Sequence, residues 1–185
     1  MKPVKPKKCK NKDCGKMFTP SYSTTQPVCS PGCAHKLSKE KDAKVQQKKR
    51  NAETKAMRED LMTKGDWLNL AQITFNTYIR LRDKDRPCIS CQVTKCEEFH
   101  AGHYIATTYS YLRFNEDNCW RQCSKCNTHL RGNSIPYRIN LIQIIGLGRV
   151  EKLENDRHKK LEMSIPEIKE LIVVYKDKIK QLKAA

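Results

Sequence analysis

Three stretches of the chain place apolar residues at helical spacing, with polar tracts between them. In the first stretch they recur every three or four positions: Leu68, Ala71, Phe75, and Tyr78 or Ile79. This spacing gives one apolar face and predicts a helix that starts at Asp66, a good N-cap, and ends near Arg86-Pro87. The second stretch, Tyr137 to Ile145, predicts a helix that stops at Gly146.

The third stretch predicts a C-terminal helix with a clear start. Ser164 can cap it, Pro166 fits its first turn, and Glu167 completes a capping box. Its apolar stripe consists of Ile165, Ile168, Ile172, Tyr175, Ile179 and Leu182. Such a stripe usually packs inside its own chain, which is the favoured interpretation, although a homodimer interface would need the same pattern.

The tracts before these helices differ in character. Residues 19–31 are rich in Ser, Thr and Pro, which favours turns and short strands. Residues 35–64 are polar and lysine-rich, and they predict either a solvated helix or a flexible linker.

Composition argues against one large core. Only 38% of the 185 residues are hydrophobic and 31% are charged, so small modules on helical connectors fit better. The formal net charge of +17 makes nucleic acid the leading partner, because phosphates supply a dense line of negative charge. A basic protein without a partner is the plainer alternative. We expect no membrane span, because the longest apolar run, Leu141–Leu147, is far shorter than the ~20 residues that a spanning helix needs. We also expect no secretion signal, because the lysine-rich N-terminus lacks an apolar h-region.

The ten cysteines point to metal rather than to disulfides, because cytosolic cysteine clusters usually bind metal or take part in catalysis. Eight of them form four close pairs: Cys9/Cys14, Cys29/Cys33, Cys88/Cys91 and Cys123/Cys126. Two pairs make one tetrahedral thiolate site, so the sequence predicts two structural Zn²⁺ ions. Cys96 and Cys119 are left over, and we interpret them as ordinary small buried or half-buried residues.

The N-terminus carries seven lysines in its first 16 residues against one acid, Asp13. Lys5, Lys7 and Lys8 are therefore candidate DNA contacts, and a merely solvated tail is the alternative. The chain divides into four predicted regions: a four-cysteine zinc module (1–35), a basic helical connector (36–86), a core with the second zinc site (87–135) and a C-terminal helical region (136–185).

The candidate catalytic residues lie in the third region (87–135). Four thiolates close the coordination sphere of the second zinc, so catalysis must come from the neighbouring His and Asn residues. Hydrolysis of a phosphodiester needs a base for water and a cation for the phosphate charge. His103 lies in a strand-forming segment, and Asn118 lies in a turn-prone stretch where its side chain is expected to hold the loop. Asn127 opens a predicted short helix that runs from the second CxxC pair, Cys123/Cys126, to Gly132.

On an α-helix Asn127 and Arg131 share a face, and His129 points nearly the opposite way. Asn127 is therefore the candidate metal-facing residue, and Arg131 a candidate phosphate contact. Alternatives remain for each residue: His100 and His103 could be surface or packed rings, Asn127 could only cap the helix, and a different register would favour His129.

These residues resemble the motif of the HNH endonucleases: a His after a first CxxC, an Asn about five residues before a second CxxC, and a His or Asn just after it. The resemblance implies a ββα-metal fold, with His103, Asn118 and Asn127 as catalytic residues, His103 as general base and Mg²⁺ or Mn²⁺ as cofactor. Many members carry Asp or His immediately before the base, where this chain has Gly102. His100 is the candidate substitute, so the implied cation ligands are His100, His103 and Asn127.

The whole chain is similar to the NinG/Rap family of lambdoid bacteriophages. The resemblance rests on the N-terminal cysteines and on the segments His100–Tyr104, Arg113–Asn118, Gln122–Asn127, Arg131–Asn133, Tyr137–Ile142 and Tyr175–Lys178. It implies an endonuclease that acts on branched recombination intermediates, such as Holliday junctions and D-loops, in the cytoplasm of the bacterial host. A non-catalytic double-zinc DNA-binding protein and an RNA-binding adaptor are the alternatives, and 7% aromatic content counts against the adaptor.

Overall fold

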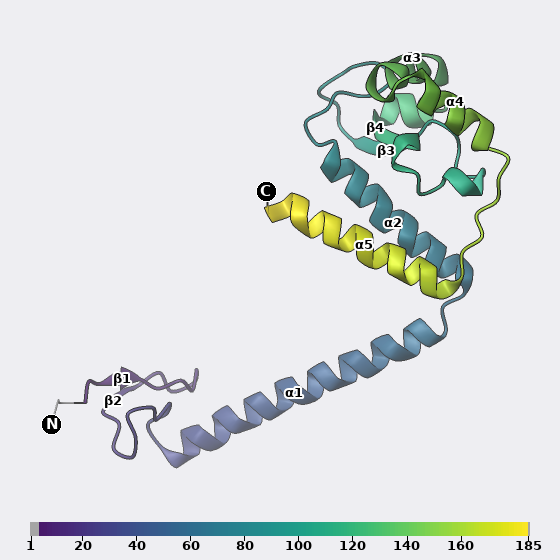
Figure 1. Cartoon of the computed structure of the whole chain (residues 1–185). Helices are drawn as coiled ribbons and strands as arrows, with labels where there is room; N and C mark the ends of the chain where they lie inside the picture. Colours follow the sequence, from purple (N-terminus) through teal and green to yellow (C-terminus); the bar gives the residue numbers. More distant parts are fainter. Residues whose placement is uncertain (1–3, 185) are drawn as a thin grey trace. The chain divides into compact units, whose positions relative to one another are not determined.

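The computed structural model describes residues 4–184, and the chain forms two compact units, Met1–Leu61 and Met62–Ala185 (Figure 1). The boundary falls inside the predicted 36–86 connector. Its first half belongs with the N-terminal cysteines, whereas its second half is built into the C-terminal unit. No helix among residues 4–184 combines the length and apolarity that crossing a membrane requires.

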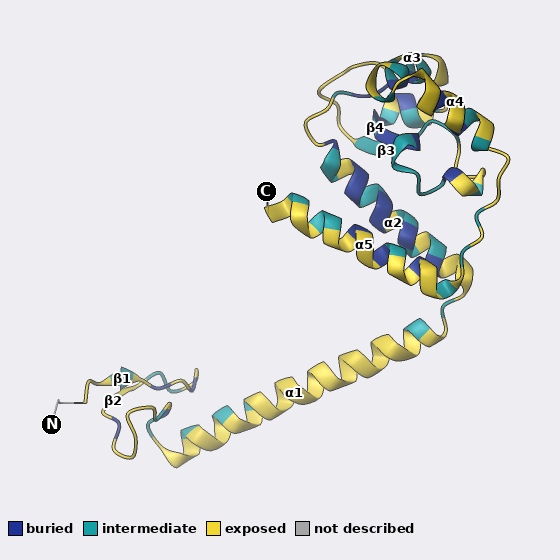
Figure 2. Ribbon diagram, in the orientation of Figure 1, coloured by how far each residue is buried: buried dark blue, intermediate teal, exposed yellow. Residues whose placement is uncertain are grey.

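The N-terminal unit is a small cysteine module followed by one long helix. Strand β1 (Lys7–Lys8) pairs with antiparallel β2 (Met17–Phe18), and helix α1 runs from Pro31 to Asp60. Ser30 caps the helix by accepting a hydrogen bond from the backbone N–H of Cys33 at 3.2 Å. None of the 30 residues of α1 is buried (Figure 2), so the lysine-rich tract is a solvated helix rather than a flexible linker.

The C-terminal unit contains two long helices that lie side by side, α2 (Lys64–Arg82) and α5 (Ile165–Ala184) (Figure 1). The predicted capping box at Ser164 and Glu167 is confirmed, with the Glu167 carboxylate accepting from the Ser164 N–H at 2.7 Å. The predicted start of α2 is wrong by one turn, because Thr63 is the cap and Asp66 is its capping-box partner at the third helical position.

Helices α2 and α5 run in the same direction. Their N-terminal halves meet in one apolar cluster, made by Trp67, Ala71, Ile168 and Ile172. Their C-terminal halves meet in a second, which contains Phe75, Tyr78, Ile79 and Tyr175. The stripe of the last helix is therefore intramolecular core, as the favoured interpretation expected, and its apolar face is already covered.

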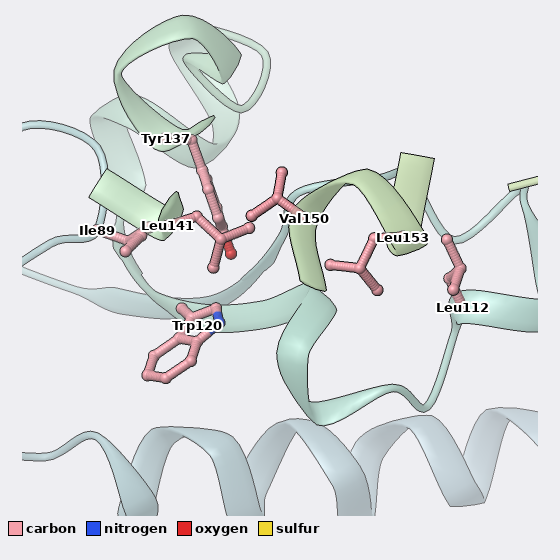
Figure 3. Packing of buried hydrophobic residues seen from close by; sticks show 7 residues of the cluster. All are labelled: Ile89, Leu112, Trp120, Tyr137, Leu141, Val150 and Leu153. Carbon is pink, nitrogen blue, oxygen red and sulfur yellow. The ribbon is translucent and has the colours of Figure 1, made fainter. Parts of the chain in front are cut away.

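A two-stranded hairpin lies between this helix pair and two shorter helices. Strands β3 (Phe99–His103) and β4 (Cys119–Cys123) are antiparallel, and His103 pairs with Cys119. One face packs on α2 through Ala101 and Cys119. The other face packs on α3 (Ser134–Ile145) and α4 (Leu147–Asp156). Figure 3 shows this second contact, which consists of Ile89, Leu112, Trp120, Tyr137, Leu141, Val150 and Leu153.

Short helical turns complete the unit and correct one prediction. The long loop between the strands contains two 3₁₀ turns, Ser110–Leu112 and Glu116–Asn118. After β4 the chain forms a single π-helical turn, Lys125–His129, and not the expected α-helix reaching Gly132. Arg131 has a left-handed φ of +50°, so it lies outside this turn. The argument that Asn127 and Arg131 share an α-helical face is therefore wrong.

Candidate functional site

Each predicted cysteine quartet comes together in space. Cys9, Cys14, Cys29 and Cys33 bring their Sγ atoms within 4.8 Å of one another, and so do Cys88, Cys91, Cys123 and Cys126. The Sγ atoms of Cys14 and Cys29 are 3.6 Å apart, and those of Cys91 and Cys123 are 3.7 Å apart. Four sulfurs at about 2.3 Å from a tetrahedral ion are roughly 3.8 Å from one another. Both groups therefore have the size of a closed tetrahedral thiolate site that could hold a metal ion.

Neighbouring polar groups donate hydrogen bonds to some of these sulfurs, which favours the anionic form of those thiols. In the first quartet hydrogen bonds from Ser30 and then Asn11 lower the pKa of the Cys33 thiol to about 6. In the second quartet the backbone N–H of Cys123 donates to Cys88 Sγ at 3.3 Å, and Asn133 donates to Cys126 Sγ at 3.5 Å. These donors compensate the burial of negative sulfur, as the outer partners of metal ligands commonly do.

The two remaining cysteines differ in burial. Cys119 is fully buried in the hairpin, as the sequence led us to expect. Cys96 is exposed, and its Sγ contacts the Glu98 carbonyl at 3.0 Å. The interpretation of Cys96 as buried or half-buried is wrong, because it lies in the irregular segment between Cys91 and β3, where no neighbouring element covers it.

Asn118 holds the loop between the strands, which is the role its position predicted. Its Oδ1 accepts from the Ile105 N–H at 2.8 Å, and its Nδ2 donates to the carbonyls of Ile105 and Leu112 at 2.9 and 3.1 Å. The side chain is fully buried. Because all these partners are backbone groups, Asn118 positions the loop between β3 and β4, and every hydrogen-bonding atom of its amide is occupied in doing so.

His100 and Asn127 are brought together beside the second quartet. Asn127 Nδ2 lies 3.0 Å from His100 Nδ1, although 27 positions separate them in the sequence. The other ring nitrogen, Nε2, lies 3.4 Å from a carboxylate oxygen of the exposed Glu98. The contact forms because His100 projects from β3 towards the π-helical turn, which follows β4 and contains Cys126 of the second quartet.

His103 lies on the opposite face of the hairpin, because successive strand residues alternate sides. Its ring centroid is 6.0 Å from that of Phe75 on α2. Its Nε2 donates to the Arg113 carbonyl at 3.0 Å, so in the neutral ring the lone pair is on Nδ1, which lies 3.6 Å from Cys119 Sγ. Burial lowers the pKa of His103 below its ordinary value, and the Arg113 carbonyl partly opposes that effect. The imidazole is therefore neutral at physiological pH.

Steric contacts explain why a glycine, Gly102, precedes His103. A Cβ added at Gly102 would lie 2.2 Å from Gln122 Oε1 and 2.8 Å from Gln122 Cβ. Gln122 is fully buried, and its Nε2 donates to Ser90 Oγ at 2.7 Å and to the Gly132 carbonyl at 2.6 Å. Since Gln122 fills the space beside Gly102, neither Asp nor His, which many HNH enzymes carry there, could occupy this position without displacing Gln122.

The remaining predicted residues lie outside this arrangement. His129 and Arg131 are exposed at the end of the π-helical turn. Lys5 and Lys8 are exposed, whereas the Lys7 ammonium donates to the Thr24 carbonyl at 2.7 Å. Sequence reasoning missed Gln122 and the contact of Cys119 with His103. The contact of Cys119 with His103 could have been predicted if the register of the hairpin had been known, because paired residues lie on the same face.

Known proteins that resemble this chain over nearly its whole length share one family description. The family model described as "Bacteriophage Lambda NinG protein" matches residues 1–184. "Protein ninG" of Salmonella phage P22 is 36% identical over 96% of this chain and 94% of its own length. The protein of the same name from Escherichia phage lambda is also 36% identical, over 96% of this chain and 93% of its own. No solved structure matches the chain.

Proposed function

The chain belongs to the NinG family of bacteriophage proteins, and from this premise we propose that it is a metal-dependent DNA endonuclease. Its substrates in this proposal are branched recombination intermediates such as Holliday junctions and D-loops, and it hydrolyses their phosphodiester bonds. The observation that carries the proposal is the contact between His100 and Asn127 on a cysteine-anchored hairpin. A protein that only binds DNA has no need to bring an imidazole and an amide together at this point.

The donor atoms of this pair fit a divalent cation. Two neighbouring ligands at about 2.0–2.1 Å from an octahedral ion are separated by roughly 3 Å, which is the spacing of the His100 and Asn127 atoms. Rotating the Asn127 amide by half a turn exchanges its nitrogen and oxygen, which presents a carbonyl oxygen as ligand. His100 and Asn127 would hold Mg²⁺ or Mn²⁺, which would stabilise the negative charge that develops on the phosphate.

We assign the proton-accepting role to His103. Its lowered pKa keeps the ring in the free-base form, and the Arg113 carbonyl fixes which nitrogen carries the hydrogen. The buried Cys119 thiol also faces the ring, and burial raises its pKa well above the usual value, so it stays a neutral and weak donor. His103 Nδ1 therefore faces no stronger donor than a thiol and can accept a proton from water.

The two cysteine quartets bind structural Zn²⁺ in this proposal, since four thiolates leave no open coordination position for catalysis. The net charge of +17 supplies the attraction for DNA, with Arg131 and the N-terminal lysines as contacts.

Cleavage of synthetic DNA tests the proposal. Zinc-loaded protein is incubated with linear, flapped and four-way DNA, with added Mg²⁺, with added Mn²⁺, and without either ion. We expect cleavage of the branched molecules only when Mg²⁺ or Mn²⁺ is added, and weaker cleavage of the linear duplex. Tight binding of the same DNA without cleavage under any of these conditions would contradict the nuclease assignment.

A non-catalytic zinc DNA-binding protein is the second candidate, and one observation favours it. Both ring nitrogens of His103 face protein groups, on the side of the hairpin away from His100 and Asn127. In that case His103 is a packing residue that ties β3 to the following loop, and its substitution reduces stability rather than a cleavage rate.

A further inference from the structure

Helix α1 gathers four of its seven lysines on one face. At about 100° per residue, four lysines fall within a sector of about 60°; they are Lys41, Lys44, Lys48 and Lys55. Three of its five acids, Asp42, Glu53 and Asp60, fall in a narrow sector about 140° away around the helix, whereas Glu40 lies outside that sector and Glu59 lies within the lysine sector. This face therefore carries four lysines against one acid, Glu59, which gives it a net positive charge.

The lysine stripe is free to meet a partner. Lys41, Lys44 and Lys48 are all exposed, and Figure 2 draws almost the whole of α1 in the colour of exposed residues. Among residues 4–184 no carboxylate lies within ion-pair distance of these three side chains, whereas Lys55 pairs with Glu59 at 3.7 Å. No residue of α1 is buried, so packing within this unit does not account for the stripe either.

We propose that α1 lies along the sugar–phosphate backbone of duplex DNA and binds it through Lys41, Lys44 and Lys48. This inference rests on the proposed function only in taking DNA as the partner. The stretch from Lys41 to Lys48 is about 10 Å long at about 1.5 Å per residue, which is the length of roughly three base pairs at about 3.4 Å each. The three lysines bind phosphates as point charges, without reading sequence, which suits an enzyme that selects DNA by its branching.

A matched pair of triple variants tests the stripe. The first replaces Lys41, Lys44 and Lys48 by Gln. The second makes the same change at Lys39, Lys49 and Arg50, which are equally exposed on other faces of α1. Both variants lose three positive charges, and Gln has a helix propensity close to that of Lys, so circular dichroism should show unchanged helix content.

Binding to a four-way junction is then measured between 50 and 200 mM salt, with no Mg²⁺ or Mn²⁺ added so that the DNA stays intact. We expect the slope of log K against log salt to fall by about 2.7 in the stripe variant, because each phosphate contact contributes about 0.9. In the control variant this slope should fall by less than about a third of that amount. DNA should also protect Lys41, Lys44 and Lys48 from chemical acetylation more than Lys39 and Lys49.

The possible outcomes separate the two proposals. Equal slopes for both variants overturn the α1 contact and leave the nuclease proposal standing. Failure of the full-length protein to bind any of the DNA overturns both. Loss of binding to anionic lipid vesicles in the stripe variant, with DNA binding unchanged, would assign the stripe to a membrane surface instead.

Discussion

The two units of this chain are held together by different means. Within residues 4–61 the buried residues include Cys9 and Val28 but no aromatic side chain, and α1 buries nothing. Residues 62–184 contain three apolar clusters in addition to their cysteines. Two clusters with equal numbers of cysteines therefore need not contribute equally to the stability of their units. In the first unit they substitute for a core, whereas in the second they fix one end of a hairpin that already has a core on each face.

The largest difference should follow from losing one ligand in the first unit. Cys29→Ser should lower the zinc content from about two ions per chain to about one and unfold the module that precedes α1, because a structural zinc contributes on the order of 10 kcal/mol to a small fold. Elemental analysis and proteolysis measure both effects. Cys96→Ser is the matched control, since Cys96 lies outside both quartets, and it should keep two ions.

The same substitution in the second unit should act more locally. The sequence alone suggests that Cys88→Ser unfolds the whole catalytic module, since a small ββα unit has little core. The clusters around Trp120 and Phe75 change that expectation. The variant should lose one zinc and the order of the segment before β3, while α2 and α5 remain paired. Hydrogen exchange reports this directly, and loss of protection in α2 and α5 would contradict the comparison.

Truncating an apolar side chain should destabilise the second unit much more than the first. Leu141→Ala removes a fully buried side chain from the cluster in Figure 3 and should lower the free energy of unfolding by about 2–5 kcal/mol. Val45→Ala changes a side chain that is 62% exposed on α1 and should stay within about 0.5 kcal/mol. Urea denaturation measures both, and equal losses would mean that α1 has a packing partner.

Removing the Asn118 amide should have a smaller effect. Asn118→Ala leaves three backbone groups of the loop unpaired, each worth about 1–3 kcal/mol when buried, and partial access of water should limit the total to about 3 kcal/mol. Urea denaturation measures the loss. Asn115→Ala is a control, because Asn115 only accepts one local N–H bond, from Asp117. A loss no larger than that of the control would contradict the role assigned to Asn118.

The parts predictable from the sequence were those governed by local rules. Cysteine spacing gave both quartets, and the Ser164 capping box gave the start of α5. Register and steric contacts are not local. The contact of His100 with Asn127, the packing of His103 on Phe75 and the space taken by Gln122 beside Gly102 all depend on how β3 pairs with β4. The π-helical turn was not predicted, because the sequence pattern indicated a short α-helix at this place.

The smallest expected effect is the pH dependence that His103 contributes. Burial disfavours its charged form, so its pKa is lower in the folded protein than in the unfolded chain. The unfolded state therefore takes up a proton first as the pH falls through about 6.5, and the folded state loses stability below that value. His103→Gln should remove this part of the loss. An NMR titration should place the His103 midpoint below that of an unfolded peptide, and a midpoint above it would contradict the burial.

In the proposed mechanism, cleavage arises from His100 and His103 of the hairpin and Asn127 of the following π-helical turn, and one set of rates tests this most directly. Cleavage of a four-way junction with added Mg²⁺ or Mn²⁺ is compared for wild type, His103→Ala, His100→Ala, Asn127→Ala and His129→Ala, each holding two zinc ions. We predict that His103→Ala loses about 10²–10⁴ in rate while still binding DNA. The His100 and Asn127 variants should be slower and partly restored by more Mn²⁺, and the exposed His129 variant should cut almost normally. An inactive His129 variant beside a fully active His103 variant, or normal rates in all four, would contradict the account.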